Sequence, residues 1–163
     1  MRCAVAKAVE YKYPEIRFEN MGPQHLDQVM EIEKQSFPTP WPRQTFEFEI
    51  FYNELAEYIV AVVGSRVLGY GGMWMVLEDA HITNVAVHPA YRGRGLGRRL
   101  LLELMRRAIV RGGRRMTLEV RPSNHAARHL YKDLGFVERG VRPKYYQDNN
   151  EDAIIMWKDD LRG

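Results

Sequence analysis

The sequence predicts a mixed α/β (α+β) fold in which helices cover both faces of one sheet. Two observations carry this prediction. The spacing of apolar residues changes repeatedly between the period of helices and that of strands, with glycines and prolines between the segments. In addition, residues 81–120 form a strand–helix–strand unit, and the two strands of such a unit lie parallel with a right-handed crossover.

The composition is that of one folded domain. The chain has 163 residues, 45% of them hydrophobic and 11% aromatic, which excludes intrinsic disorder. No run approaches the ~18 apolar residues of a membrane span. The net charge of +3 does not by itself indicate a nucleic-acid partner. The single cysteine, Cys3, cannot form an internal disulfide, which favours a reducing, cytoplasmic location. We expect one domain at residues 16–160 after a poorly specified leader at 1–15.

The first half of the domain is predicted to hold a strand, two helices and a hairpin. A strand at 16–19 precedes a helix at 23–36, in which Leu26, Val29, Met30 and Ile32 form an apolar stripe. Three prolines in the stretch 37–42 end this helix, and a shorter helix follows at 43–52. Apolar, β-branched runs at 58–63 and 67–75 then flank a Gly-Ser turn, which predicts a hairpin.

The second half alternates strands and helices. A strand at 81–87 leads through a Gly- and Arg-rich loop into a helix at 96–111, which two glycines end. One face of this helix is apolar: Leu96, Leu100, Leu101, Leu104, Met105 and Ala108. A strand at 116–120, a helix at 124–134, and strands at 136–142 and 153–157 complete the order.

The loop Arg92-Gly93-Arg94-Gly95-Leu96-Gly97 joins a strand to a helix N-terminus, a place where proteins bind phosphate groups. Its glycines let several backbone N–H groups point the same way, and Arg92, Arg94 and Arg98 add positive charge. The alternative is a tight strand-to-helix connection. The third glycine of a dinucleotide fingerprint would fall at Arg98, and the P-loop lysine is missing, so neither of those motifs is present.

The spacing Arg-x-x-Gly-x-Gly resembles the pyrophosphate loop of the GNAT superfamily of acyl-CoA-dependent N-acetyltransferases, and VAVHPAYRGRGLG is similar to that family's full signature. The blocks SFPTPWP, LEVRPSN, HLYKDLGF and KYYQDNNEDAIIM resemble the bacterial subfamily that acetylates the N-terminal alanine of a ribosomal protein (RimI type). The resemblance covers residues 16–158. It implies the GNAT fold, with a mostly antiparallel sheet of six to seven strands and a central, splayed parallel strand pair.

The resemblance also implies acetyl-CoA as co-substrate, with direct transfer of acetyl to a protein N-terminus in a ternary complex. Val85 would donate its amide to the thioester carbonyl. Taken alone, residues 85–87 are typical of a buried strand, and Asn124 of a helix cap. The implied coenzyme-binding residues are Val85, Ala86, Val87, Arg92, Gly93, Arg94, Gly95, Leu96, Gly97, Arg98 and Asn124.

Two residues are implied as catalytic by the resemblance: Glu119 as the general base, acting directly or through water, and Tyr131 as the general acid. A phenol has a pKa of ≈ 10 and is a suitable proton donor to a thiolate. An N-terminal amine, with a pKa of ≈ 7.7–8, makes a modest demand on its base. Taken alone, Glu119 could instead face solvent, and Tyr131 could pack with Leu130 and Leu134.

By family analogy, Phe37, Trp41, Tyr145 and Tyr146 form the walls of a groove for the N-terminal peptide of a protein, expected to be a ribosomal protein. Adjacent tyrosines in a hairpin point to opposite faces, so one can pack on the sheet while the other binds peptide. Three nearby acids either attract a basic peptide or belong to a polar turn: Asp148, Glu151 and Asp152.

Two other functions stay open at this point: the same chemistry on a small amine such as a polyamine or aminoglycoside, and a non-catalytic CoA-binding or ribosome-associated module. The tyrosine pair and the EDAIIM strand argue against the first, since they resemble peptide-binding members of the family, and the joint presence of Glu119 and Tyr131 argues against the second. We expect no metal, because His125 and His129 have no apparent third ligand. No stacking aromatics interleave with the Arg-rich helix, so we expect no nucleic-acid partner. We expect no membrane partner, and a monomer or weak dimer.

Overall fold

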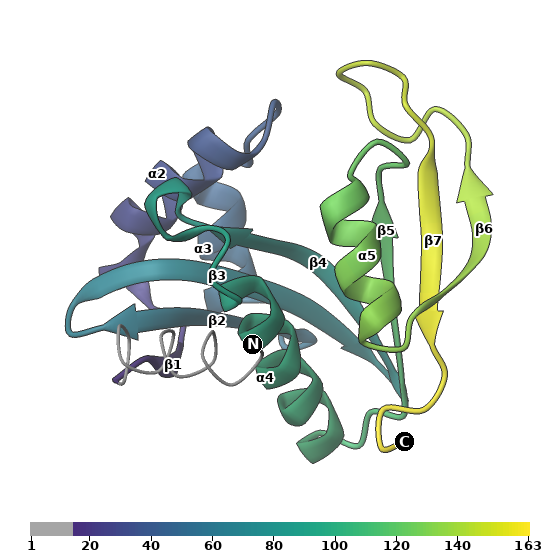
Figure 1. The fold of residues 1–163 in the computed structure, drawn as a ribbon. Coiled ribbons are helices and arrows are strands. Elements are labelled where there is room, and N and C mark those ends of the chain that lie inside the picture. The colour runs from purple at the N-terminus through teal and green to yellow at the C-terminus, as the bar shows by residue number, and fades with distance from the viewer. Residues whose placement is uncertain (1–14) are drawn as a thin grey trace, which may run out of the picture.

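A computed structural model describes residues 15–163 of the chain (Figure 1). The leader expected at 1–15, including Cys3, lies outside the described residues except for Glu15. The elements follow in the order β1 (Arg17–Asn20), η1 (Pro23–His25), α2 (Leu26–Ser36), α3 (Arg43–Phe51), β2 (Ala56–Val63), β3 (Arg66–Val76), β4 (Asp79–Val87), η2 (Pro89–Tyr91), α4 (Leu96–Val110), β5 (Arg115–Val120), α5 (His125–Asp133), β6 (Val137–Arg142) and β7 (Ala153–Lys158).

The strands form one sheet in the order β1-β2-β3-β4-β5-β7-β6. All neighbours are antiparallel except β4 and β5, which confirms the predicted mixed sheet. The parallel pairing is short and runs only from Asp79 opposite Arg115 to His81 opposite Thr117. Beyond this point the two strands diverge, so the predicted splayed pair is present in the middle of the sheet (Figure 1).

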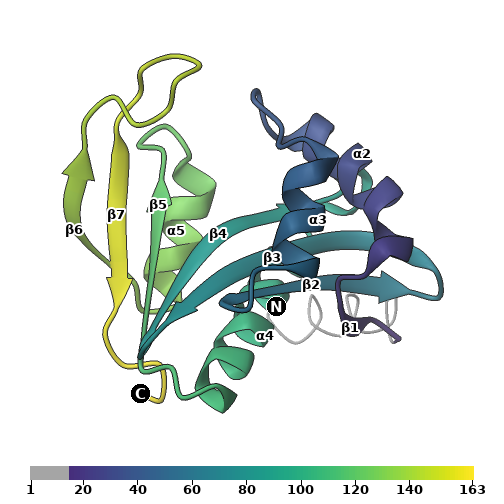
Figure 2. The same cartoon turned by 180° about the vertical axis from the view of Figure 1, so that it is seen from behind.

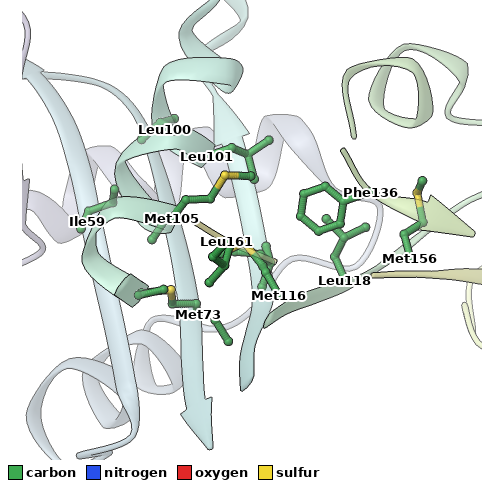
Figure 3. Packing of buried hydrophobic residues seen from close by; sticks show 14 of the residues in the cluster. Ile59, Met73, Leu100, Leu101, Met105, Met116, Leu118, Phe136, Met156 and Leu161 are labelled. Atoms are coloured by element: carbon green, nitrogen blue, oxygen red, sulfur yellow. The ribbon is translucent and has the colours of Figure 1, made fainter. Parts of the chain in front are cut away.

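Helices cover both faces of the sheet, as predicted: α2 and α3 lie on one face, α4 and α5 on the other (Figures 1 and 2). Alternate residues of each strand point to opposite faces. In β2, Tyr58 and Val60 therefore pack with the α2–α3 layer, whereas Ile59 and Ala61 pack under α4. Figure 3 shows the hydrophobic core between α4 and the strands, to which Ile59 belongs.

The predicted apolar face of α4 is confirmed, because all six of its residues are buried. Full burial of a leucine or methionine side chain contributes about 1.5–3 kcal/mol to stability. This face fixes α4 against β3 and β4. The N-terminus of α4 is thereby fixed next to the end of β4, where the coenzyme loop is expected.

Several element ends differ from the sequence prediction, among them those of α2 and β4. The first turn of the predicted helix at 23–36 is a separate 3-10 turn, η1, and α2 begins at Leu26. Strand β4 begins at Asp79 rather than 81, because its pairing with β3 continues to the tight turn, with Val76 opposite Asp79. Beyond the turn, Gly72 pairs with Asn84 and Met73 with Ile82, which leaves Thr83 as an extra residue, a β-bulge in β4.

Candidate functional site

A cleft of ≈ 920 Å³ opens where β4 and β5 diverge. Its walls come from α2 and the loop after it, from the splayed halves of both strands, from α5, and from the loop between β6 and β7. The cleft brings together eight predicted site residues: Phe37, Trp41, Val85, Glu119, Asn124, Tyr131, Tyr145 and Tyr146. Among the lining residues that were not selected from the sequence are Glu33, Asn84 and Arg121.

The bulge in β4 lies at the mouth of the splay. Thr83 Oγ1 lies 2.7 Å from the Tyr58 hydroxyl and donates to Asn84 Oδ1 at 3.0 Å, which fixes the backbone just before Val85. Asn84 Nδ2 is buried without a hydrogen-bond partner among the described residues. Val85 packs toward α4 and α5, whereas Ala86 points to the α2–α3 core, so the side chain of Ala86 does not reach the cleft.

Glu119 lies on β5 and projects into the cleft, with 10% of its side chain exposed. Its Oε2 is 2.7 Å from Nε2 of His81, which comes from the parallel neighbour β4. Its Oε1 is 3.8 Å from the Arg142 guanidinium. The carboxylate is therefore held by a neighbouring strand rather than facing bulk solvent. His81 was not selected from the sequence, because its strand also carries other polar residues and nothing in the pattern marks the histidine.

Tyr131 lies on α5 and lines the cleft. Burial raises the pKa of Tyr131 to about 12, so its phenol keeps its proton at neutral pH. The ring also packs against Phe136, with ring centroids 5.9 Å apart. Both interpretations offered by the sequence are thus compatible with this position: a packed ring, and a hydroxyl held protonated at the cleft.

The loop before α4 has the backbone of an anion-binding turn. Gly93 and Gly95 have φ angles of 76° and 80°, in the left-handed region that favours glycine. Gly95 is the N-cap of α4, and the first N–H groups of a helix have no partner within it. A Cβ at either glycine would meet nothing within 4 Å, so this surface is open to a ligand. The loop adjoins the cleft at the end of β4 without lining it.

Two of the loop arginines are held within the protein. Arg92 donates to the Val87 carbonyl and to Ser36 Oγ, both at 2.9 Å, and so ties the loop to β4 and α2. Arg98 forms an ion pair with Asp133 of α5. Asn124 caps α5 by accepting from the Ala127 amide at 3.2 Å, which confirms the capping interpretation of that residue.

The first wall of the cleft is the segment 37–42, and a buried carboxyl anchors it. Glu33 accepts a hydrogen bond from the Trp41 amide at 2.9 Å and another from the Tyr70 hydroxyl. Burial raises the pKa of both Glu33 and Tyr70. The Trp41 ring packs on Phe46, with centroids 5.4 Å apart. The proline-rich segment is therefore fixed at Trp41, beside the cleft.

The second wall is the loop between β6 and β7, in which the Tyr145 and Tyr146 rings are perpendicular at 5.0 Å. Two of the loop's acids pair with Arg121. The hydrogen bond from Arg121 holds the pKa of Asp148 below its usual range, whereas the pKa of Glu151 is lowered mainly by the hydrogen bonds from Ser123 and further by Arg121. Asp152 accepts the Lys144 amide at 2.9 Å. The acids are thus engaged within the loop, which favours a structural turn over a surface that attracts cations.

Across residues 15–163, no group of three or more His, Cys, Asp or Glu side chains could hold a metal ion. Within the same part of the chain, no helix has the length and apolar character needed to cross a membrane.

Comparisons with known proteins identify relatives of this chain. Residues 26–136 match the acetyltransferase (GNAT) family. The [ribosomal protein bS18]-alanine N-acetyltransferase of Salmonella typhimurium is 38% identical over 80% of this chain and 88% of its own length. A Bacillus subtilis protein, provisionally given the same name, is 44% identical over 85% of this chain and 91% of its own. The crystal structure of the Escherichia coli ribosomal-protein-S18-alanine N-acetyltransferase has a TM-score of 0.81 and 33% identity, covering 91% of this chain and 96% of that one.

Proposed function

The chain belongs to the acetyltransferase (GNAT) family, and from this premise we propose that it transfers acetyl from acetyl-CoA to the N-terminal alanine of a ribosomal protein. The observation that carries the proposal is the cleft at the β4–β5 splay, where a carboxylate and a protonated phenol lie between two aromatic walls. The proposed acceptor follows from the relatives, which are named as alanine N-acetyltransferases of a ribosomal protein. A ribosomal protein as acceptor makes the cytoplasm the proposed location.

Acetyl-CoA is the acetyl donor of this family, and the residues present fit it. The start of α4 offers unpaired N–H groups beside two open glycines, which suits a diphosphate. Beyond His81 and Thr117 the facing edges of β4 and β5 do not pair with each other, which leaves room for an extended ligand. In the proposal, residues 85–87, the loop 92–98 and Asn124 hold the donor. Arg92 and Arg98 contribute by fixing the loop.

The proposed mechanism assigns each proton to a residue. Glu119, oriented by His81 at 2.7 Å, accepts the proton of the α-amine directly or through one water. The amide of Val85 donates to the thioester carbonyl, where negative charge develops. As the new C–N bond forms and the C–S bond breaks, Tyr131 gives its proton to the departing sulfur. The pKa of about 12 keeps this proton on Tyr131 until the thiolate leaves.

The charge of the cleft favours a peptide over a polyamine. A polyamine carries several positive charges and requires carboxylates that are free to meet them. Here Asp148 and Glu151 pair with Arg121. Aromatic walls remain, and these suit the backbone and small first residue of an N-terminal peptide: Phe37, Trp41, Tyr145 and Tyr146.

Mass spectrometry tests the proposal directly. The enzyme is incubated with acetyl-CoA and, in separate reactions, a peptide that starts with Ala-Arg, the same peptide starting with Met, and spermidine. We expect one acetyl group on the Ala peptide. Equal acetylation of the Met peptide would replace the alanine preference with a broad N-terminal activity. Acetylation of spermidine alone, or no product at all, would overturn the proposed acceptor.

A further inference from the structure

The loop between β6 and β7, residues 143–152, forms the second wall of the cleft but has no hydrophobic anchor. None of its side chains is buried, and Tyr146 and Glu151 are its only partly buried residues. Ten irregular, exposed residues have many accessible conformations, and fixing each one costs conformational entropy. The position of the two tyrosines therefore depends on the polar contacts that hold this loop.

Most of these contacts converge on Arg121. Its guanidinium lies 2.8 Å from Asp148 Oδ1 and 3.4 Å from Glu151 Oε1, and donates to Asn149 Oδ1 at 3.1 Å. The same group lies over the Tyr146 ring, 3.8 Å from its centroid, in a cation–π contact. One side chain thus contacts four residues of the loop.

Ser123 provides a second attachment, which reaches only Glu151. Its amide and its hydroxyl both donate to the Glu151 carboxylate, at 2.9 and 3.0 Å. This carboxylate is therefore shared between Ser123 and Arg121. Without Arg121, the end of the loop near Glu151 stays attached, whereas Asp148 loses its ion-pair partner and the Tyr146 ring loses its cation–π contact.

Arg121 follows Glu119 by two residues and comes directly after β5 ends at Val120. Both side chains line the cleft. The loop that carries the tyrosines is therefore tied to the strand that carries the proposed base. The guanidinium already meets two carboxylates, an amide oxygen and a ring, which argues against Arg121 itself binding the acceptor.

We propose that Arg121 is a positioning residue that orders the β6–β7 loop, so that Tyr145 and Tyr146 form a ready-made wall for the acceptor peptide. This inference rests on the proposed function. Ordering the loop before binding lowers the cost of binding a peptide. It does not change the groups that act on the reacting atoms. Arg121 should therefore act on the KM of the peptide, and leave kcat and the KM of acetyl-CoA near their wild-type values.

Steady-state kinetics of Arg121→Met and Arg121→Lys test this with two acceptors, an Ala-started peptide and propylamine, which has no peptide backbone or side chains for the tyrosine wall to contact. We expect Arg121→Met to raise the KM of the peptide about tenfold, the order expected when two side chains must be ordered on binding. The rate with propylamine should stay unchanged. Arg121→Lys keeps the charge but loses the planar fork, so its peptide KM should lie between that of wild type and that of Arg121→Met.

Two further variants keep the test decisive. Asp148→Asn changes only an exposed loop residue, so it should fold, and it should raise the peptide KM less than Arg121→Met does. Arg139→Met is the matched control, because Arg139 makes an exposed ion pair with Asp159 away from the cleft, and it should behave as wild type. The inference is overturned if Arg121→Met and Asp148→Asn leave the peptide KM unchanged, or if the loss is equal for propylamine or appears in the KM of acetyl-CoA. A wild-type enzyme that acetylates no peptide would instead overturn the proposed function.

Discussion

Tyr131 and Glu33 are both acids shielded from water beside the same cleft, and shielding favours the protonated form of each. For Tyr131 this is useful to the proposed chemistry, because a general acid must hold its proton until the leaving group needs it. For Glu33 the consequence is structural, since its carboxyl joins the Trp41 amide to the Tyr70 hydroxyl under the first wall.

Tyr131→Phe removes the proton and keeps the ring that packs on Phe136. We expect kcat to fall about 100-fold, the lower end of a typical general-acid contribution, with the KM of acetyl-CoA unchanged. Steady-state kinetics at saturating peptide measure both constants. Tyr52→Phe serves as the control, because Tyr52 is 75% exposed at the end of α3. A kcat within twofold of wild type would remove Tyr131 from the mechanism.

Glu33→Gln should change how stability depends on pH. The folded pKa of Glu33 is raised above that of the unfolded chain, so between these two pKa values the folded state holds a proton that the unfolded state has lost. The contribution of wild-type Glu33 is therefore fully present below the unfolded pKa of about 4.5 and decreases as pH rises through the folded pKa. Glutamine keeps neutral hydrogen-bonding groups at every pH.

Urea denaturation at pH 5 and pH 8 measures this difference. The free energy of unfolding of Glu33→Gln, relative to wild type, should be higher at pH 8 than at pH 5. Glu31→Gln, an exposed position on the same helix, should show no such trend. An equal difference at both pH values for Glu33→Gln would contradict the argument.

At the scale of elements, the junction between β4 and α4 depends on two glycines in the left-handed region. Gly95→Ala meets no steric neighbour, so its cost comes from the φ angle of 80° alone, about 1–2 kcal/mol. The strain also displaces the first N–H groups of α4, so the KM of acetyl-CoA should rise several-fold. Gly64→Ala is the matched control: its φ is 57°, it too meets nothing within 4 Å, and it lies in the β2–β3 turn.

Thermal unfolding and acetyl-CoA kinetics of both glycine variants separate the two effects. Both should lose similar stability, but only Gly95→Ala should lose affinity for acetyl-CoA. An unchanged KM for Gly95→Ala would show that the loop backbone does not hold the coenzyme.

The elements themselves were predictable from sequence because each carries a local signal. The apolar stripe of α4, the turn between β2 and β3, and the crossover from β4 to β5 depend on residues near one another in the chain. The exact ends of strands were less accessible, since β3 and β4 extend through mutual pairing to a turn whose own residues are not typical of strands. In the turn between β3 and β4, Leu77 adopts a positive φ of 56°, and a leucine in the sequence gives no indication of such a turn.

The supporting residues of the site could not be predicted, because their partners are distant in sequence. His81 meets Glu119 only through the parallel register of β4 and β5, and Arg121 meets Asp148 only because β7 pairs with β5. In the sequence, Glu33 looks like any polar residue of an amphipathic helix. Its partner Tyr70 is 37 positions away and lies beside it only in the folded chain. The family resemblance supplied Glu119 and Tyr131, but it did not supply the contacts that orient them.

At the scale of the whole molecule, the sheet consists of two parts, which are joined by three residue pairs between β4 and β5. Strands β1–β4 lie on one side of this junction, and β5, β7 and β6 on the other (Figures 1 and 2). Packing of Leu118 and Phe136 with the α4 side of the core joins the parts from below the cleft (Figure 3). In the proposed complex, the coenzyme contacts both parts and so adds to this junction.

Hydrogen exchange measures that coupling. With saturating CoA, amide exchange should slow in peptides covering residues 82–87 and 118–121, the facing edges that do not pair with each other, and at the start of α4. Exchange in β2 and the adjoining half of β3 should stay the same, because those strands are already paired on both sides. Binding of a ligand to the folded state alone also raises the free energy of unfolding, by about 2.7 kcal/mol at 100 times its Kd. If protection appeared only at the start of α4, the coenzyme would bind the loop without entering the splay, and the proposed position of the thioester beside Glu119 and Tyr131 would be wrong.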